Sequence, residues 1–453
     1  MISNLKPYPR YKPSGVDWLG DVPEHWEVKR LKRICFFIYG DSLPVELRRV
    51  GNISVYGSNG PVGYHDAANT LAPCIIVGRK GSFGKVRYSK KPVFAIDTTY
   101  YIDKRYTSNN LNWLYYALSW LRLDGASRDS AVPGLDREEA YARILPLPPH
   151  DEQKYINNFL NVISSKINRF IRKRRRLIEL LNEYKQAIIN QYVTGKIDPR
   201  TGKPYPRYKP SGVDWLGDVP EHWDIKKLKQ ITRFQNGFAF KPSDWEHEGV
   251  PIIRIQNLNG SRNFNYTKRT DIPSIFLVKP GDLLFSWSGN RGTSFGSYIW
   301  DRDFPGYLNQ HIFKLHGYTC NKTYFVFLLR SVTRYIEDEK THGIIGLVHV
   351  TKPELGSTTV ALPPILEQEE IAERLMGESN RIDAALASAQ REIALIREFR
   401  TRLIADVVTG KVDVRKAAKN LPEEPEEEIE PMEEEAEPED TTEVSEDKEA
   451  AVE

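Results

Sequence analysis

The chain has 453 residues, and its formal net charge of +3 is the difference between 64 basic and 61 acidic side chains. The content of 40% hydrophobic residues excludes a wholly disordered chain, and the length suggests roughly two to four domains of about 100–200 residues. No apolar run approaches the roughly 18 residues of a membrane helix, the start lacks the apolar stretch of a signal peptide, and three scattered cysteines indicate neither a disulfide framework nor a zinc site.

The charge is segregated along the chain. Residues 421–453 hold 17 acidic residues and one basic residue, so this tail carries −16 and the body, residues 1–420, carries +19. We expect the tail from 416 onward to be disordered and solvated, and we consider as a sharper hypothesis that it folds back on the basic body and competes there with a polyanionic partner. The body favours a polyanionic partner, and we expect a cytoplasmic protein with no membrane association.

In chain order, the first element is a leader that recurs. Residues Tyr8–Trp26 are repeated letter for letter at Tyr205–Trp223, an offset of 197. Proline breaks the leader while tryptophan and leucine anchor it, so we interpret it as a structural plug rather than a ligand contact. A second repeated pair has an offset of 215, since Leu147–Gln153 (LPPHDEQ) recurs as Leu362–Gln368 (LPPILEQ).

The first insert, residues 35–146, is predicted to be mixed α/β. Its β-rich runs are followed by a helix at Leu111–Leu121. The loop Gly78–Arg87 places four cations among three glycines, which suits phosphate and guanine contacts, although ordinary hairpin tips with solvated charges would look similar. The predicted strands are Cys74–Val77, Val86–Ser89 and Tyr100–Ile102, and the candidate DNA-binding residues are Tyr64, Arg79, Lys80, Ser82, Lys85 and Arg87.

A long helix follows each LPP motif. Apolar residues spaced alternately three and four apart indicate a coiled-coil seam, and Gly195 and Gly410 lie where helix C-caps belong. Some 40 residues make a helix of roughly 60 Å. We expect each long helix to pack against the other one; the alternative is that each packs only on its adjacent domain. The predicted seams are Ile156, Leu160, Ile163, Ile167, Phe170, Arg174, Leu177, Leu181, Tyr184 and Ile188, and Ile382, Leu386, Ala389, Ile393, Ile396, Arg400, Leu403 and Val407.

The second insert, residues 232–361, diverges in sequence but keeps the skeleton of the first. Ile75–Lys85 aligns with Leu284–Gly292, and Ile96–Tyr100 aligns with Leu308–Ile312. Arg, Asn and Gln in its loops are donors suited to bidentate contacts with base edges. The predicted strands are Ile252–Ile255, Asp282–Ser286 and Ile312–Leu315, the predicted helix is Lys322–Tyr335, and the candidate DNA-binding residues are Arg254, Gln256, Asn257, Arg262, Lys268, Arg269, Trp287, Asn290 and Arg291.

The first copy passes from VTGKIDPR at Val193–Arg200 into its following leader without a break, whereas the matching Val408–Arg415 ends the body. The repeat therefore closes if the N-terminus lies beside residues near 415, and we predict a pseudo-two-fold arrangement. The predicted domains are 1–146, leader with first insert; 147–200, first helix and linker; 201–361, leader repeat with second insert; 362–415, second helix; and 416–453, tail.

No catalytic motif is found. The sequence contains no G-x-x-x-x-G-K-[ST], no G-x-G-x-x-G opening a helix, no H-E-x-x-H and no Asn-Pro-Pro-aromatic tetrad of an adenine methyltransferase. We interpret Asp338–Lys340 as a solvated helix face rather than a nuclease motif, His311 as a turn residue or polar contact, and Cys74 as a core thiol. We therefore expect neither catalytic residues nor a metal site.

The order W-L-G-x-V-P-E-H-W, variable domain, L-P-P-x-x-E-Q, long helix and V-T-G-K-[IV]-D over residues 8–415 resembles the DNA-specificity (S) subunit of Type I restriction-modification enzymes. Gly281–Ser286 and Leu308–His311 are also similar to that family, whereas Asp97-Thr98-Thr99 in the first insert departs from its Asn-Gln-His triplet.

The resemblance implies an α/β (α+β) fold with two target-recognition domains, separated by two long helices that form an antiparallel coiled coil. It implies double-stranded DNA with a bipartite asymmetric site, two methyltransferase subunits and restriction subunits as partners. S-adenosylmethionine would belong to the methyltransferase subunits, ATP and Mg²⁺ to the restriction subunits, and no cofactor to this non-catalytic chain. The rival interpretations are a non-DNA coiled-coil scaffold and a single-chain restriction or modification enzyme.

Overall fold

The computed structural model describes residues 5–125, 134–340 and 346–421, which divide into two compact units. Each unit contains one of the two inserts, residues 35–146 in unit 1 and 232–361 in unit 2, which we call its recognition domain. Each unit also contains part of both long helices, which run through both units. Among the described residues, no helix is long and apolar enough to cross a membrane. The predicted domain boundaries stay a prediction. The division into two compact units cuts across both long helices, so it does not test boundaries that treat each helix as a separate segment. Unit 1 comprises residues 1–176 and 389–439, and unit 2 comprises residues 177–388 and 440–453.

The recognition domain of unit 1 is built on a four-stranded antiparallel sheet in the order β4-β10-β7-β8. Its central strands β7 and β10 are buried along their whole length, as their continuous apolar runs predict. Helix α1 packs on β7 and β8, and a second sheet has the order β6-β5-β9. The three strands and the helix predicted for the first insert are confirmed. The elements are β1 Tyr11–Pro13, β2 Asp21–Pro23, β3 Glu27–Arg30, β4 Ile38–Tyr39, β5 Ile53–Gly57, β6 Gly60–His65, β7 Cys74–Gly78, β8 Val86–Ser89, β9 Phe94–Ala95, β10 Thr99–Asp103, α1 Leu111–Trp120, α2 Arg137–Ala142 and β11 Ile144–Leu147.

The recognition domain of unit 2 repeats this plan with the sheet β15-β23-β19-β21 and a second sheet β17-β16-β22-β18. One predicted strand is misplaced: β16 ends at Ile253 and Ile255 begins the helical turn α5, because the Asn257 side chain accepts the Arg254 N–H. The predicted helix from Lys322 is longer than expected. The elements are β12 Tyr208–Pro210, β13 Asp218–Pro220, β14 Asp224–Lys227, α4 Leu228–Ile231, β15 Arg233–Asn236, β16 Val250–Ile253, α5 Ile255–Leu258, β17 Asn265–Thr267, β18 Leu277–Val278, β19 Leu283–Ser286, β20 Ser288–Asn290, β21 Gly296–Ile299, β22 Gly306–Leu308, β23 Ile312–His316, α6 Lys322–Lys340, β24 Leu347–His349, α7 Lys352–Ser357 and β25 Thr359–Leu362.

A matched pair of glycines shows how far the two divergent domains share a backbone. A Cβ at Gly40 would lie 2.1 Å from the Ile96 carbonyl oxygen, and one at Gly237 would lie 2.0 Å from the Asn309 carbonyl oxygen. Any side chain at either position would overlap the facing backbone. The common skeleton predicted from the two inserts is confirmed, but its register is one residue off: Ile96 corresponds to Asn309 rather than to Leu308, and Thr99 rather than Tyr100 corresponds to Ile312.

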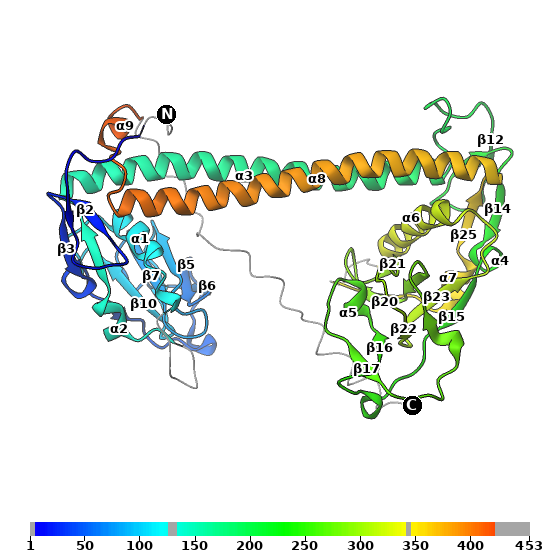
Figure 1. Ribbon diagram of the computed structural model, residues 1–453, viewed down its shortest axis with the longest axis horizontal. Helices are drawn as coiled ribbons and strands as arrows, with labels where there is room; N and C mark the ends of the chain where they lie inside the picture. The colour runs from blue at the N-terminus through cyan, green and yellow to red at the C-terminus, as the bar shows by residue number, and fades with distance from the viewer. Residues whose placement is uncertain (1–4, 126–133, 341–345, 422–453) are drawn as a thin grey trace. The chain divides into compact units, whose positions relative to one another are not determined.

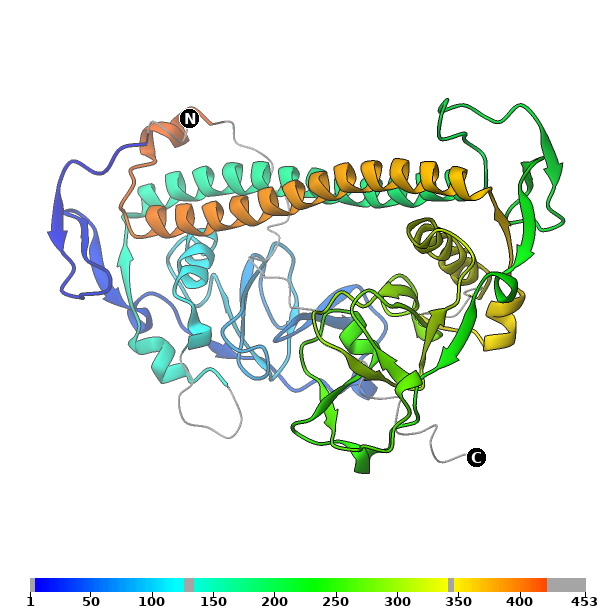
Figure 2. The same cartoon turned by 45° about the vertical axis from the view of Figure 1, so that its right-hand side comes forward.

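The long helices α3 (His150–Val193) and α8 (Ile365–Val408) run antiparallel, side by side in both views (Figures 1 and 2). In unit 1, Arg400 Nη1 donates to Asn168 Oδ1 at 3.0 Å, and Arg174 Nη2 lies 2.7 Å from Glu392. In unit 2, Lys185 Nζ donates to Asp383 Oδ1 at 2.7 Å. The predicted antiparallel coiled coil is confirmed.

Most of the predicted seam is buried or half-buried, including Ile156, Ile167, Ile382 and Val407. Tyr184 is the exception, with 53% of its surface exposed. Its assignment to the seam is wrong. The three-four spacing places Tyr184 on the same helix face as the seam, but the polar end of a tyrosine favours solvent where the two helices cover that face only partly. Gly195 and Gly410 have φ of +70° and +76°, which confirms the predicted helix C-caps.

The two ends of the repeat are joined by equivalent backbone contacts. In unit 1, Asp413 N–H donates to the Lys6 carbonyl at 2.8 Å. In unit 2, Asp198 N–H donates to the Lys203 carbonyl at 2.9 Å, and these residues are the counterparts of Asp413 and Lys6 in the repeat. The closure predicted from the sequence is confirmed, since a non-covalent contact at one junction replaces the covalent connection at the other.

A circular permutant is expected to fold. Joining Arg415 to Lys6 through Thr-Gly recreates the sequence that links Arg200 to Lys203, so the new chain would begin at Thr201 and end at Arg200. We expect a cooperative urea transition within about 2 kcal/mol of the parent in free energy of unfolding, the main loss coming from α9. A permutant opened between Arg174 and Arg175, inside α3, is the control. Equal disruption of both proteins would contradict the closure.

The structured chain extends beyond the predicted start of the tail at 416. Residues Arg415–Lys419 form α9, and Ala418 and Leu421 are buried. The predicted boundary is therefore about six residues early, because these apolar side chains pack on the body. The rest of the predicted disordered tail, 422–453, lies outside the described residues.

Candidate nucleic-acid interface

A buried glutamate in each unit holds the leader against the start of a long helix. In unit 1, Glu152 of the LPP motif accepts from the Trp26 indole N–H at 2.8 Å and the Tyr8 hydroxyl at 3.2 Å, and His25 Nε2 lies 2.5 Å away. Arg415 Nη1 donates to the same carboxylate at 3.1 Å. A carboxylate with several donors is a strong, directional anchor, so the leader is the structural plug that its composition predicts.

The second copy repeats this arrangement in unit 2 except for the arginine, since Arg200, the counterpart of Arg415, bonds Glu370 instead. Glu367 accepts from the Trp223 indole N–H at 2.9 Å and from the Tyr205 hydroxyl, and His222 Nε2 lies 2.7 Å from it. Burial and the neighbouring Glu367 raise the pKa of Tyr205 far above its ordinary value, so its hydroxyl keeps its proton and stays a donor. The Tyr and Trp that recur in the two identical leaders thus make the same hydrogen bonds to a buried glutamate in each unit.

The glutamine beside each glutamate positions the recognition domain. Gln153 Oε1 accepts the backbone N–H of Asn110, the N-cap of α1, at 2.9 Å. In unit 2, Gln368 Oε1 accepts the backbone N–H of Asn321, immediately before α6, at 2.8 Å. Each E-Q pair therefore connects three parts within its own unit: the leader, the long helix and the recognition domain.

The basic loop of the first recognition domain, Gly78–Arg87, folds against the turn between β5 and β6. Lys85 Nζ donates to Asn59 Oδ1 at 3.0 Å, and Arg87 Nη2 donates to the Asn59 carbonyl at 2.7 Å. Ser82 Oγ lies 3.4 Å from the same side-chain oxygen. One asparagine thus gathers three of the predicted residues, while Lys80 and Tyr64 are exposed, Tyr64 by 64%.

A tyrosine between two guanidinium groups extends this basic surface. Arg79 Cζ lies 4.9 Å and Arg137 Cζ 5.0 Å from the centroid of the Tyr39 ring, which is 43% exposed. Arg79 Nη1 also donates to the Asp97 carbonyl at 2.9 Å. Cation–π contact orients both charges without neutralising them. Sequence reasoning missed Tyr39 and Arg137, which lie 40 and 58 residues away from Arg79 along the chain.

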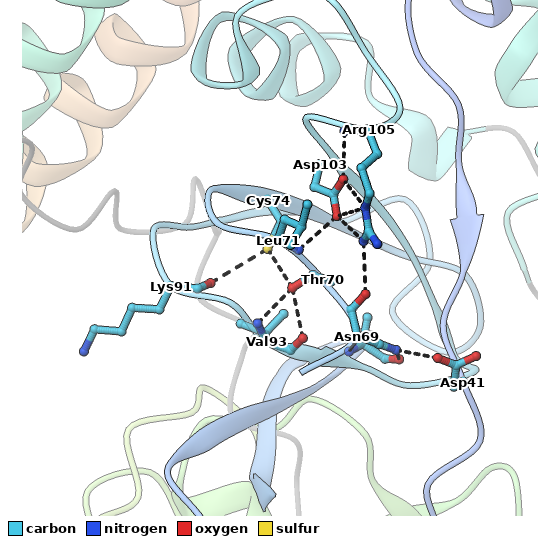
Figure 3. A network of polar contacts seen from close by, with 10 residues as sticks. Asp41, Asn69, Thr70, Leu71, Cys74, Lys91, Val93, Asp103 and Arg105 are labelled. Carbon is cyan, nitrogen blue, oxygen red and sulfur yellow. Dashed lines mark hydrogen bonds and ion pairs between the residues drawn. The ribbon is translucent and has the colours of Figure 1, made fainter. Parts of the chain in front are cut away.

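A polar network braces the loops where β7 begins and β10 ends (Figure 3). Arg105 Nη2 donates to Asp103 Oδ2 at 2.5 Å and to the Asn69 carbonyl at 3.2 Å, and Asn69 Nδ2 donates to Asp41 at 2.9 Å. Burial of Asp103 opposes its charge, but bonds from Arg105 and the Leu71 backbone N–H hold its pKa below the ordinary value. The network is structural, because its acceptors are bonded internally.

Cys74 belongs to the same network and is a core thiol, as predicted. Its side chain is fully buried, and its sulfur lies 3.5 Å from Thr70 Oγ1. Burial raises the pKa of the thiol to about 11, so it remains protonated and unreactive at neutral pH.

The second recognition domain presents an aromatic cluster around Trp287. Its ring stacks on His311, with centroids 5.1 Å apart, and its indole N–H donates to the Gln310 carbonyl at 3.0 Å. The His349 ring meets it edge-on at 4.9 Å. Gln310 and His349 are exposed. Sequence reasoning did not include them among the candidate DNA-binding residues, although the triplet Asn309-Gln310-His311 resembles the family. His311 makes a stacking contact with Trp287, in agreement with its interpretation as a turn residue or polar contact.

The loop Arg254–Asn263 uses some predicted residues for its own structure. Asn257 is 2% exposed, and its Nδ2 donates to the Asn263 carbonyl at 2.9 Å while its Oδ1 caps the turn α5. Gln256 Nε2 donates to the same carbonyl at 3.3 Å. Arg254 lies 5.0 Å over the Trp245 ring. Asn257 therefore shapes the loop. Arg254 is half-buried, and its Nη1 donates to Asn265 Oδ1 at 3.3 Å.

The remaining predicted residues are divided between ion pairs and exposed positions. Lys268 bonds Glu248 at 2.6 Å, Arg269 bonds Asp244 and Asp271, and Arg291 bonds Asp338. Asn290 and Arg262 are exposed. Asp338 also pairs with Arg334, which supports its interpretation as part of a charged helix face. Among the described residues, no group of His, Cys, Asp and Glu is arranged to hold a metal ion.

These surfaces share a character: exposed cations and amides beside aromatic rings, carried by loops on rigid sheets. Such loops donate hydrogen bonds to phosphates and base edges, and a nucleic acid is the polyanion that they fit. The contacts of the individual predicted residues with DNA stay a prediction. The two units present different residues on the same frame, so the two surfaces would read different sequences.

The chain belongs to the family described as the type I restriction modification DNA specificity domain, two copies of which match residues 23–180 and 220–386, more than half of the chain. It is therefore a specificity subunit of the type I restriction-modification class, as its motifs indicate.

Two relatives and one solved structure agree with this assignment. The chain is 25% identical to the type I restriction enzyme MjaVIII specificity subunit of Methanocaldococcus jannaschii, over 87% of this chain and 94% of that protein. It is 28% identical to the Escherichia coli EcoBI specificity subunit over 44% of this chain and 41% of that one. A chain from a structural study of the assembly and conformational transition of the type I R-M system has a TM-score of 0.60 at 13% identity, covering 85% and 98% of the two chains, which shows the shared fold.

Proposed function

We propose that this chain reads a bipartite, asymmetric site in double-stranded DNA, one half with each recognition domain, and that it docks two methyltransferase subunits, with restriction subunits joining them. The observation that carries the proposal is the pair of unlike polar surfaces on matched frames, one around Tyr39 and the loop Gly78–Arg87, the other around Trp287. Two different readers related by a repeat suit a non-palindromic target.

The chemistry of this chain is recognition alone. Exposed cations such as Lys80 would supply salt-sensitive phosphate contacts, while amides such as Asn290 would discriminate base edges. We assign S-adenosylmethionine to the methyltransferase subunits, ATP and Mg²⁺ to the restriction subunits, and no cofactor to this chain. The complex would act on DNA in the cytoplasm. A scaffold without DNA has no use for two basic recognition surfaces, and a single-chain enzyme would need motifs that the sequence lacks.

Two substitutions separate the two kinds of contact. In the complex with its methyltransferase, Lys80→Ala is expected to weaken binding for all sequences alike and to lower the salt slope by about 1. Asn290→Ala is expected to cost about 1–3 kcal/mol at one base pair of one half-site, which relaxes specificity there alone.

The measurement is co-expression with the methyltransferase followed by genome sequencing for N6-methyladenine, together with DNA binding over a salt series. Arg10→Ala and Arg207→Ala, exposed and equivalent leader cations, are the matched controls and should leave the target unchanged. Absence of sequence-specific methylation from the wild-type complex would refute the proposal. Relaxed specificity at both half-sites in Asn290→Ala would refute the proposal that each recognition domain reads one half-site.

A further inference from the structure

Helix α3 carries an exposed basic segment that the recognition surfaces do not use. Residues 166–176 contain seven cations and no acidic residue, and Arg174 bonds Glu392 of the antiparallel helix. The segment spans roughly 15 Å at 1.5 Å per residue. We name it the basic helix segment; its exposed members are Lys166, Arg169, Arg172, Lys173, Arg175 and Arg176.

The facing part of the antiparallel helix adds more positive than negative charge. Residues 389–402 of α8, which run beside the segment in unit 1, contain four arginines and only two glutamates, Glu392 and Glu398. Like charges three and four residues apart destabilise a helix by about 0.2–0.5 kcal/mol for each pair. A net basic helix surface attracts a polyanion.

The acidic tail leaves the body beside this segment. Asn158 Nδ2 of α3 donates to the Ala418 carbonyl of α9 at 3.3 Å, and Lys419 Nζ lies 5.8 Å from the Tyr155 ring centroid. Leu421, two residues after α9, is 8% exposed. From Asn158 to Lys166 the distance along α3 is about 12 Å. The last described residue of the chain is therefore anchored about two helical turns from the first cation.

The sequence beyond this anchor complements the segment. Residues 422–439 lie outside the described residues; they contain 11 glutamates and no lysine or arginine. Eighteen residues reach up to about 60 Å when extended, several times the distance to be covered. Tethering gives such a segment an effective concentration in the millimolar range, which favours the tail over free DNA as the resident polyanion.

We propose that the glutamate-rich segment 422–439 docks on the basic helix segment of α3 and keeps DNA phosphates from it. The docking is an ionic contact within one chain and needs no partner subunit. It restricts DNA to the recognition domains, because the strongest sequence-independent attraction on the helices is occupied. The consequence for DNA rests on the proposed function, whereas the docking itself does not.

The docking is tested by carbodiimide cross-linking of the full chain, read by mass spectrometry. Lys166 and Lys173 are the amines within the segment, so cross-links from residues 423–439 should concentrate on them at low salt and disappear at about 0.5 M salt, where screening is strong. Exposed Lys32, Lys91 and Lys104 of the same unit are internal controls. Cross-links spread evenly over all five lysines, or none at the segment, would overturn the docking.

The consequence is tested with DNA that lacks the target. Deletion of 422–453 should raise low-salt affinity by roughly three- to tenfold, and this gain should vanish in the variant Arg172→Gln/Arg175→Gln/Arg176→Gln. Lys32→Gln/Lys91→Gln/Lys104→Gln changes the net charge equally and should retain the gain; circular dichroism verifies folding of both. An equal gain in both triple variants would show that the tail covers another surface and would overturn the proposal. Intact cross-linking without any DNA effect would leave the docking standing and reject only the exclusion of DNA.

Discussion

A seven-residue insertion into both long helices, after Arg176 in α3 and after Ser388 in α8, is expected to lengthen the DNA spacer between the half-sites by about three base pairs. Seven helical residues add about 10.5 Å, and each base pair of DNA rises about 3.4 Å. These positions are the boundary between the two units, so each unit keeps its own contacts. The heptad returns the seam to nearly the same face of the coiled coil.

Methylation sequencing of the variant complex measures the spacer directly. Both half-site sequences should stay as in the parent, since no recognition residue changes. Insertion into α3 alone is the control. Because the insertion separates Arg174 from Lys185, the two helices can keep either the Arg174–Glu392 pair or the Lys185–Asp383 pair but not both. This variant should therefore lose methylation rather than show a longer spacer. An unchanged spacer in the doubly inserted protein would mean that the helices do not determine the spacing.

Replacement of Glu152 by alanine is expected to destabilise unit 1 by about 3 kcal/mol or more. The buried carboxylate accepts from Tyr8, Trp26 and Arg415, and a hydrogen bond to a charged group contributes about 1.5–3 kcal/mol. The loss also leaves buried donors without an acceptor. Urea denaturation followed by tryptophan fluorescence should show the lower midpoint, and amide exchange should increase first in the leader.

Asp151→Ala and Glu369→Ala are the matched controls, because each removes an exposed carboxylate beside the buried one. They should change the midpoint little. Glu367→Ala should repeat the effect of Glu152→Ala in unit 2, whereas Glu152→Gln should lie between the parent and the alanine variant because it keeps one acceptor oxygen. A midpoint for Glu152→Ala equal to that of Asp151→Ala would contradict the anchoring role.

The sequence alone predicted most of the secondary structure of the recognition domains. Short continuous apolar runs rich in β-branched residues, such as Cys74–Val77, are typical of a buried strand, and the structure has β7 there. Local rules failed where a side chain bonded the backbone of a nearby residue: Asn257 accepts the Arg254 N–H, and the expected strand end at Ile255 becomes a helical turn. Periodicity also misplaced Tyr184, because spacing shows which face a residue shares but not how deeply that face is covered.

The candidate site was predictable only in part. Residue type and glycine spacing pointed to the loop Gly78–Arg87, and its cations do gather around Asn59. Tyr39, Arg137 and His349 carry no local signal, since they join the surfaces only through strand pairing and helix placement. The role of Glu152 and Glu367 was likewise hidden, because a glutamate in an LPP motif looks like any residue of a first helical turn.

What the sequence by itself determined is the repeated plan: two leaders, two inserts, two long helices, the closure near Arg415 and the separation of a basic body from an acidic tail. These follow from identity at fixed offsets, apolar periodicity and charge counts, which need no coordinates. Only the tertiary structure decided which residues of the repeat form hydrogen bonds with one another. Hydrogen bonds such as those at Glu152 join residues more than a hundred positions apart, and their geometry depends on burial that no local pattern encodes.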